Sequence, residues 1–167
     1  MEQELTQVMQ ATALAVFIYM LCAWAVSVGL KDAGVADVFW GPGFILVAAI
    51  GSATAGSAGA RQIIILLIVS IWGLRLGVHI FLRNRGKGED FRYRDMRRRA
   101  GRMFVIKSLF KVFLFQGLIM WIVSLPIQAV AAAGDKGEIT FFDITGLLLW
   151  CGGFYFEAVS DSQLARF

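Results

Sequence analysis

Residues 72–102 read WGLRLGVHIFLRNRGKGEDFRYRDMRRRAGR, and this stretch decides how the rest of the chain is arranged. It begins inside an apolar run and ends as a dense basic segment. Nine of the chain's 16 lysines and arginines lie between Arg83 and Arg102. In the apolar part, Arg75, His79 and Arg83 recur at every fourth position, which places them on one face of a helix. Charged side chains are costly in lipid, so we expect this face to line protein or water.

The composition is typical of integral membrane proteins. Of the 167 residues, 58% are hydrophobic and 17% are charged, and the mean hydropathy is +0.69. The net charge of +4 is concentrated in the basic segment, which favours a role in membrane orientation or anion binding over general nucleic-acid binding. Cys22 and Cys151 lie in apolar runs and are interpreted as packing residues rather than a disulfide.

Five apolar runs are long enough to cross a hydrocarbon core of about 30 Å. We expect spans at residues 11–30, 37–55, 62–82, 104–130 and 140–160. The predicted fold is therefore an all-α polytopic transmembrane helix bundle that forms a single domain over residues 1–167. Counting positive charges places the basic loop in the cytoplasm, the N-terminus outside and the C-terminus in the cytoplasm.

Three interpretations of the basic loop, residues 83–102, stay open. Cations beside a membrane span fix its orientation and contact anionic lipid. Acidic and aromatic residues nevertheless lie among these cations, in the order Glu89, Asp90, Phe91, Arg92 and Tyr93. Arginines beside a tyrosine offer forked donors for the phosphate of a cofactor. Salt bridges within the loop are the third interpretation.

Intramembrane charges elsewhere also have two interpretations each. Arg75 either pairs with Asp37 or Glu157 inside the bundle, or lines a polar cavity with His79. His79 is alternatively a core histidine that is hydrogen-bonded to the backbone. Asp37 is either the N-cap of the second span or a carboxyl that keeps its proton and polarises a ligand carbonyl.

Glu157 and Asp161 lie four residues apart on the last span, so both face the same way. Like charges at this spacing repel, and the basic loop is the partner that we expect to neutralise them. The pair either docks the last span electrostatically or forms the edge of a nucleotide site, where carboxylates accept ribose hydroxyls.

Several motifs of soluble enzymes are missing from the chain. It has no G-x-G-x-x-G after a strand, no Walker loop, no H-E-x-x-H and no Cys/His cluster with zinc spacing. The single histidine, His79, excludes a metal site built from several histidines. No metal is therefore expected.

Five short blocks occur in a fixed order along the chain: DVFWG at 37–41, WGLRL at 72–76, EDFRY at 89–93, Gln116, and FEAVSDSQL at 156–164. In this order they resemble the membrane-embedded steroid 5-alpha-reductase-like family, and more narrowly its bacterial branch of unknown function numbered 1295. The resemblance covers essentially the whole chain.

The resemblance implies a bundle of seven or more spans that binds NADPH from the cytosolic side. Such an enzyme would reduce a carbon–carbon double bond conjugated to a carbonyl in a lipid-like or steroid-like substrate. Asp37 would be the catalytic acid at the carbonyl. The candidate cofactor-binding residues are Arg83, Arg92, Tyr93, Glu157 and Asp161. The candidates that line the substrate cavity are Trp40, Arg75, His79 and Gln116.

The family continues beyond the position of residue 167 with a cytosolic segment and further spans. We therefore expect either the N-terminal part of a longer enzyme, located in the bacterial inner membrane and completed by a C-terminal segment, or a truncated product without activity. Two other functions stay open at this point. One is a membrane methyltransferase of related architecture that uses S-adenosylmethionine. The other is a non-catalytic membrane protein that binds anionic lipid or a partner through the basic loop.

Overall fold

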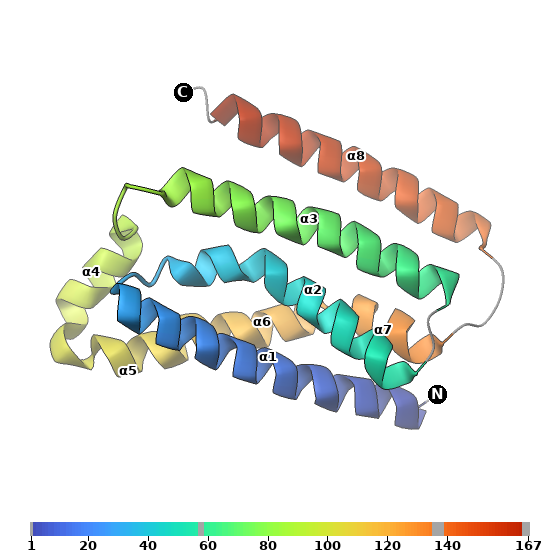
Figure 1. Ribbon diagram of the computed structural model, residues 1–167, viewed down its shortest axis with the longest axis horizontal. Coiled ribbons are helices and arrows are strands. Elements are labelled where there is room, and N and C mark those ends of the chain that lie inside the picture. The colour runs from blue at the N-terminus through green and yellow to red at the C-terminus, as the bar shows by residue number, and fades with distance from the viewer. Residues whose placement is uncertain (1, 57–58, 135–138, 165–167) are drawn as a thin grey trace.

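A computed structural model describes residues 2–56, 59–134 and 139–164 of the chain. All regular structure in these ranges is helical (Figure 1). Within them, five helical stretches are long and apolar enough to cross a membrane: α1 (Glu2–Leu30), α2 (Val35–Ala55), α3 (Ala60–Asn84), the stretch Phe91–Val123, and α8 (Phe141–Leu164). The predicted all-α bundle with five transmembrane spans is thereby confirmed.

The fourth spanning stretch is interrupted rather than one continuous α-helix. It contains α4 (Phe91–Ala100), a 3-10 turn (Gly101–Met103), α5 (Phe104–Ser108), a π-helical segment (Leu109–Leu114) and α6 (Phe115–Val123). A turn at Ser124 separates α6 from α7 (Leu125–Ala133), so the span predicted for 104–130 ends early. Pro126 lies in the first turn of α7, where its missing N–H is not needed.

Most of the segment predicted as a basic loop is helical. Arg83 lies in the last turn of α3, residues 85–90 connect α3 to α4, and the remaining cations lie on α4 or just after it. Asp90 caps α4, because its carboxylate accepts the backbone N–H of Arg92 at 2.9 Å. Figure 1 shows that α4 lies at one end of the bundle, between the ends of α3 and α5. We call this end, defined by residues 83–102, the basic end.

Helix α2 is the centre of the bundle, since it packs against α1, α3, α6 and α7. It approaches α3 most closely where two glycines face each other. A Cβ atom on Gly73 would lie 2.6 Å from the backbone oxygen of Gly41. Small residues of this kind let membrane helices approach backbone to backbone.

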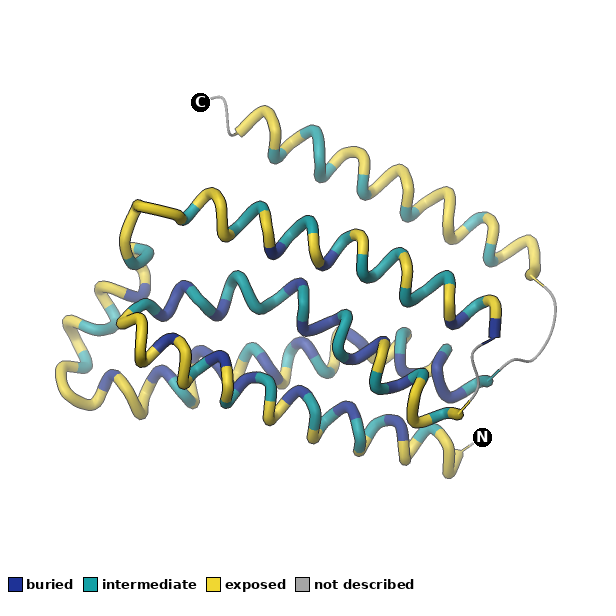
Figure 2. The backbone as a smooth tube through the Cα atoms, viewed as in Figure 1, coloured by how far each residue is buried: buried dark blue, intermediate teal, exposed yellow. Residues whose placement is uncertain are grey.

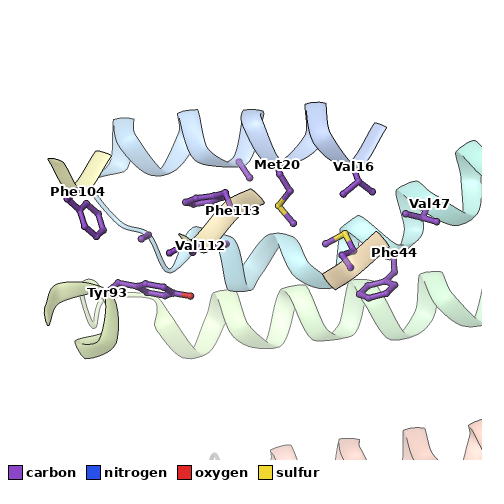
Figure 3. Close-up of a cluster of buried hydrophobic side chains, with 12 residues drawn as sticks. Val16, Met20, Phe44, Val47, Tyr93, Phe104, Val112 and Phe113 are labelled. Atoms are coloured by element: carbon purple, nitrogen blue, oxygen red, sulfur yellow. The ribbon is translucent and has the colours of Figure 1, made fainter. Parts of the chain in front are cut away.

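Buried side chains fill the space between α1, α2 and the fourth stretch, as Figure 3 shows. Tyr93 of α4 and Phe104 of α5 close this core at the basic end. The other side chains labelled there are Val16, Met20, Phe44, Val47, Val112 and Phe113. The core thus fixes α4 against the ends of α1 and α2.

Helix α8 differs from the rest, because it lies along the outer side of α3 and has no buried residue (Figures 1 and 2). The first turn of α1 and the last turn of α8 lie at opposite ends of the molecule (Figure 1). That arrangement agrees with an odd number of spans. Residues 135–138, which the sequence predicts as part of a loop, lie outside the described residues.

Candidate functional site

Asp37 of α2 lies next to polar side chains of α4 and α6 at the basic end. Its Oδ1 accepts a hydrogen bond from the Tyr93 hydroxyl at 2.9 Å, and its Oδ2 accepts one from the Arg92 guanidinium at 3.3 Å. The Tyr93 hydroxyl also accepts a longer bond, 3.5 Å, from Nε2 of Gln116 on α6. We call Asp37, Arg92, Tyr93 and Gln116 the Asp37 cluster.

The members of the Asp37 cluster differ in exposure. Tyr93 is 6% exposed and belongs to the hydrophobic core, whereas the Arg92 side chain is 60% exposed. Gln116 Oε1 is buried, and within the described residues it has no hydrogen-bond partner. A buried unsatisfied carbonyl is costly, so it calls for an explanation. A ligand bound beside Gln116 would supply one.

The Asp37 cluster borders an open pocket of about 310 Å³. The pocket is lined by Asp37, Trp40, Ile80, Arg83, Arg92 and Gln116. Carboxylate, guanidinium and amide groups thus face the same space as an indole and an aliphatic side chain. We call this space the Asp37 pocket.

The structure corrects one interpretation of Asp37. Helix α2 begins at Val35, and Gly34 occupies the N-cap without a side-chain hydrogen bond. Asp37 therefore lies inside the first turn, and its carboxylate reaches α4 instead of capping α2. Two donors from another helix hold it there, which is the arrangement of a functional or cross-linking acid rather than of a cap.

A second polar cluster joins α3 to α8. Arg75 forks between Glu157, with Nη1 to Oε1 at 3.1 Å, and Asp161, with Nη2 to Oδ2 at 2.8 Å. Trp72 Nε1 donates to the second oxygen of Glu157 at 3.0 Å. His79 Nε2 lies 3.8 Å from Asp161 Oδ1. We call these five residues the Arg75 cluster.

The Arg75 cluster decides between the partners proposed for Arg75. Pairing with Glu157 is confirmed, whereas pairing with Asp37 is wrong, because Asp37 is held by α4. The expectation that the basic loop neutralises Glu157 and Asp161 is also wrong. Arg75 does so from α3, one side chain reaching both carboxylates.

A larger pocket, about 500 Å³, lies beside the Arg75 cluster at the basic end. It is lined by His79, Leu82, Arg83, Arg85, Lys87, Asp161 and Leu164. We call it the α3–α8 pocket. Arg83 lines both this pocket and the Asp37 pocket, so the last turn of α3 separates the two spaces.

The predicted site residues are therefore divided between two neighbouring places. Of the five predicted cofactor residues, Arg83 and Asp161 line the α3–α8 pocket, and Glu157 belongs to the Arg75 cluster. Arg92 and Tyr93 instead join Asp37. Of the predicted cavity residues, Trp40 and Gln116 line the Asp37 pocket, whereas Arg75 and His79 belong to the Arg75 cluster.

Salt bridges within the segment 83–102, one of the three interpretations of that segment, are confirmed, and the pair of Glu89 with Arg97 positions α4. Glu89 accepts two hydrogen bonds from Arg97, at 2.7 and 2.9 Å, and a third from the backbone N–H of Ala33 between α1 and α2. Partial burial acts to raise the pKa of Glu89, but these donors leave the pKa below its usual value. Likewise, the hydrogen bond from Arg92 lowers the pKa of Asp90.

An ion pair that sequence reasoning missed lies at the opposite end of α3. Arg61 donates to both oxygens of Asp143 on α8, at 2.7 and 2.8 Å. In the sequence, both residues are isolated charges at the edges of apolar runs. Their positions along the chain do not predict that they form a pair. Among the described residues, no group of three or more His, Cys, Asp or Glu side chains is arranged to hold a metal ion.

The sequence matches the family described as a protein of unknown function (DUF1295), over residues 23–167. No curated protein and no solved structure matches the chain. The matched range contains every member of the Asp37 and Arg75 clusters. This chain of five transmembrane helices is a member of the DUF1295 family.

Proposed function

We propose that this chain provides the carbonyl-activating part of an NADPH-dependent membrane oxidoreductase. The enzyme would reduce a carbon–carbon double bond conjugated to a carbonyl in a lipid-like substrate. One observation carries the proposal: Asp37 borders a pocket with one oxygen fixed by the buried Tyr93 and the other shared with the exposed Arg92. The resemblance of the five sequence blocks to steroid 5-alpha-reductase-like proteins supports it.

The two oxygens of Asp37 suit different tasks. Oδ1 stays hydrogen-bonded to Tyr93, which positions the carboxyl. Oδ2 has a longer contact to the exposed Arg92, which a substrate carbonyl would replace when the carboxyl carries a proton. A hydrogen bond from this position stabilises the enolate-like oxygen that forms during reduction. Asp37 is thus the proposed catalytic residue, and Tyr93 is a positioning residue.

The residues of the α3–α8 pocket fit a phosphate-bearing cofactor. Arg83, Arg85 and Lys87 supply cationic donors for phosphate groups, and Asp161 supplies a carboxylate for a ribose hydroxyl. When bound, NADPH would supply the hydride for the substrate's double bond. Because Arg83 lines both pockets, it would hold the cofactor next to the space where Asp37 meets the carbonyl.

The same proposal includes an orientation in the membrane. NADPH is a cytosolic cofactor, so the basic end would face the cytoplasm of a bacterial cell, with the bundle in the inner membrane. The excess of arginine and lysine at that end supports this orientation.

A label-transfer experiment tests the proposed reaction. Membranes that contain the protein would be incubated with NADPH tritiated at the nicotinamide C4 position, and the lipid extract would be counted. Asp37→Asn should lower tritium transfer about 100-fold, because it replaces the acidic O–H donor by a weaker amide N–H donor, and Tyr93→Phe about tenfold, because it removes the hydrogen bond that positions Asp37. Asp95→Asn, which changes an exposed acid outside both clusters, should leave transfer unchanged.

Two outcomes would contradict the proposal. Transfer that is unaffected by Asp37→Asn would remove the acid from the mechanism. Methyl transfer from labelled S-adenosylmethionine to lipid, without tritium transfer, would assign the chain to the membrane methyltransferases instead.

A further inference from the structure

The cations at and next to the basic end differ in whether an acid pairs with them. Arg92, Arg97 and Arg98 form ion pairs, and their acidic partners are Asp37, Asp90, Glu89 and Asp95. Within the described ranges, no ion pair involves Arg99, Lys107 or Lys111. Salt bridges with its own acids therefore account for only some cations of the basic end, and for neither Lys107 nor Lys111 just beyond it.

The same three cations line one pocket between α4 and the segment Phe104–Leu114 that follows it. The pocket holds about 390 Å³ and is lined by Arg92, Asp95, Met96, Arg99, Ala100, Lys107 and Lys111. Its single acid, Asp95, is bound to Arg98 at 2.9 Å. The pocket is therefore strongly positive, and its floor of Met96 and Ala100 is apolar. Clustered ammonium and guanidinium groups of this kind suit a phosphate.

Exposed apolar side chains next to the pocket identify where it lies in the membrane. Met103, Ile106 and Phe110 are 52%, 53% and 61% exposed, and they alternate along the chain with Lys107 and Lys111. In a spanning helix such apolar side chains contact acyl chains, whereas lysines reach toward the headgroups. The pocket is thus at the height at which lipid phosphates occur.

We propose that the pocket of Arg99, Lys107 and Lys111 binds the phosphate headgroup of an anionic phospholipid. The acyl chains of that lipid would lie along Ile106 and Phe110. Positive charges beside a membrane surface attract anionic lipid, and a formed pocket adds selectivity to this attraction. The site shares no lining residue with the α3–α8 pocket and shares only Arg92 with the Asp37 pocket, and it does not depend on the proposed reductase activity.

Native mass spectrometry of the detergent-purified protein tests the site with two defined lipids, phosphatidylglycerol and phosphatidylcholine. The wild-type protein should retain phosphatidylglycerol in preference to phosphatidylcholine. The double variant Lys107→Gln and Lys111→Gln should bind phosphatidylglycerol on the order of tenfold more weakly. The matched control is Arg94→Gln with Arg102→Gln, which removes two exposed cations of the same segment that do not line the pocket. It should change binding less than twofold.

Three results would overturn the site. Equal losses in both double variants would mean that overall charge, not the pocket, attracts the lipid. Equal retention of the two lipids would remove the headgroup selectivity. Displacement of the lipid by excess inorganic phosphate would assign the pocket to a free anion. Arg99→Gln, on α4 rather than on the segment that carries the two lysines, should alone weaken phosphatidylglycerol binding severalfold. If the double lysine variant does not fold, Arg99→Gln tests whether the pocket binds the lipid, and unchanged binding would overturn the site.

Discussion

Single backbone atoms set how closely α2 and α3 approach. A Cβ atom on Gly73 would meet the backbone oxygen of Gly41 at 2.6 Å and its carbonyl carbon at 3.0 Å. Backbone cannot yield as a flexible side chain can, so Gly73→Ala should force the two helices apart. We expect a loss of about 1–3 kcal/mol in the free energy of unfolding, measured as a lower thermal midpoint in detergent.

Gly29→Ala is the matched control, since nothing lies within 4 Å of the added Cβ. Its midpoint should stay the same or rise slightly, because alanine favours the helix. If Gly73→Ala behaved like this control, the two helices would separate without cost, and the close approach of α2 and α3 would not contribute to stability.

The partners of single residues were the least predictable part of the site. Sequence spacing placed Glu157 and Asp161 on one helix face, and the structure confirms that they act together on Arg75. The spacing did not decide between Asp37 and Glu157 as the partner of Arg75. That choice depends on the register between α3 and its neighbours, which a single sequence does not contain.

At the level of elements, α4 depends on a carboxylate whose charge changes with pH. Glu89 binds Arg97 and the Ala33 N–H, and these donors keep its pKa below the unfolded value of about 4.3. A lowered folded-state pKa stabilises the protein above the unfolded pKa, and this contribution is lost as the pH falls through the folded pKa. The docking of α4 should therefore weaken in acid.

Glu89→Gln tests this dependence, because glutamine keeps the shape of the side chain without its charge. The variant should have a lower thermal midpoint than the wild type at neutral pH. The difference should shrink as the pH falls through the lowered folded-state pKa of Glu89, where the wild-type carboxyl becomes protonated. A midpoint difference that stays constant from pH 7 to pH 3 would mean that Glu89 acts through packing rather than through its charge.

The helices of the structure show which elements could be predicted from the sequence. The five apolar runs were sufficient to predict five spans, because length and hydropathy decide membrane crossing. Helix α4 could also have been predicted. One helical face carries Tyr93, Met96 and Ala100, and all three pack on the core. The many arginines around these three residues obscured their helical spacing.

The π-helical segment Leu109–Leu114 could not be predicted from the sequence, since an inserted residue in an apolar run changes no periodicity that can be recognised.

At the scale of the whole molecule, α8 is held to the bundle mainly by ion pairs with α3. Helix α8 buries no residue, so apolar packing holds it weakly. Ion pairs instead join it to α3 near both ends: Arg61 with Asp143, and Arg75 with Glu157 and Asp161. Removing one member of such a pair leaves its partner unneutralised in a poorly solvated place. The arginines of α3 should therefore control where α8 lies.

Electron paramagnetic resonance can measure this directly. Spin labels on the exposed positions Leu67 of α3 and Leu148 of α8 would report the distance between the helices, with Cys22 and Cys151 replaced by serine. The wild-type arginines should give a narrow distance distribution, and Arg61→Gln with Arg75→Gln should broaden it. The control replaces Arg85 and Lys87 of the α3–α8 pocket by glutamine, which also removes two positive charges but leaves the three ion pairs between α3 and α8 intact. It should leave the distance distribution narrow. If the arginine variant also stayed narrow, apolar contacts would hold α8, and the Arg75 cluster would be free to serve a ligand instead.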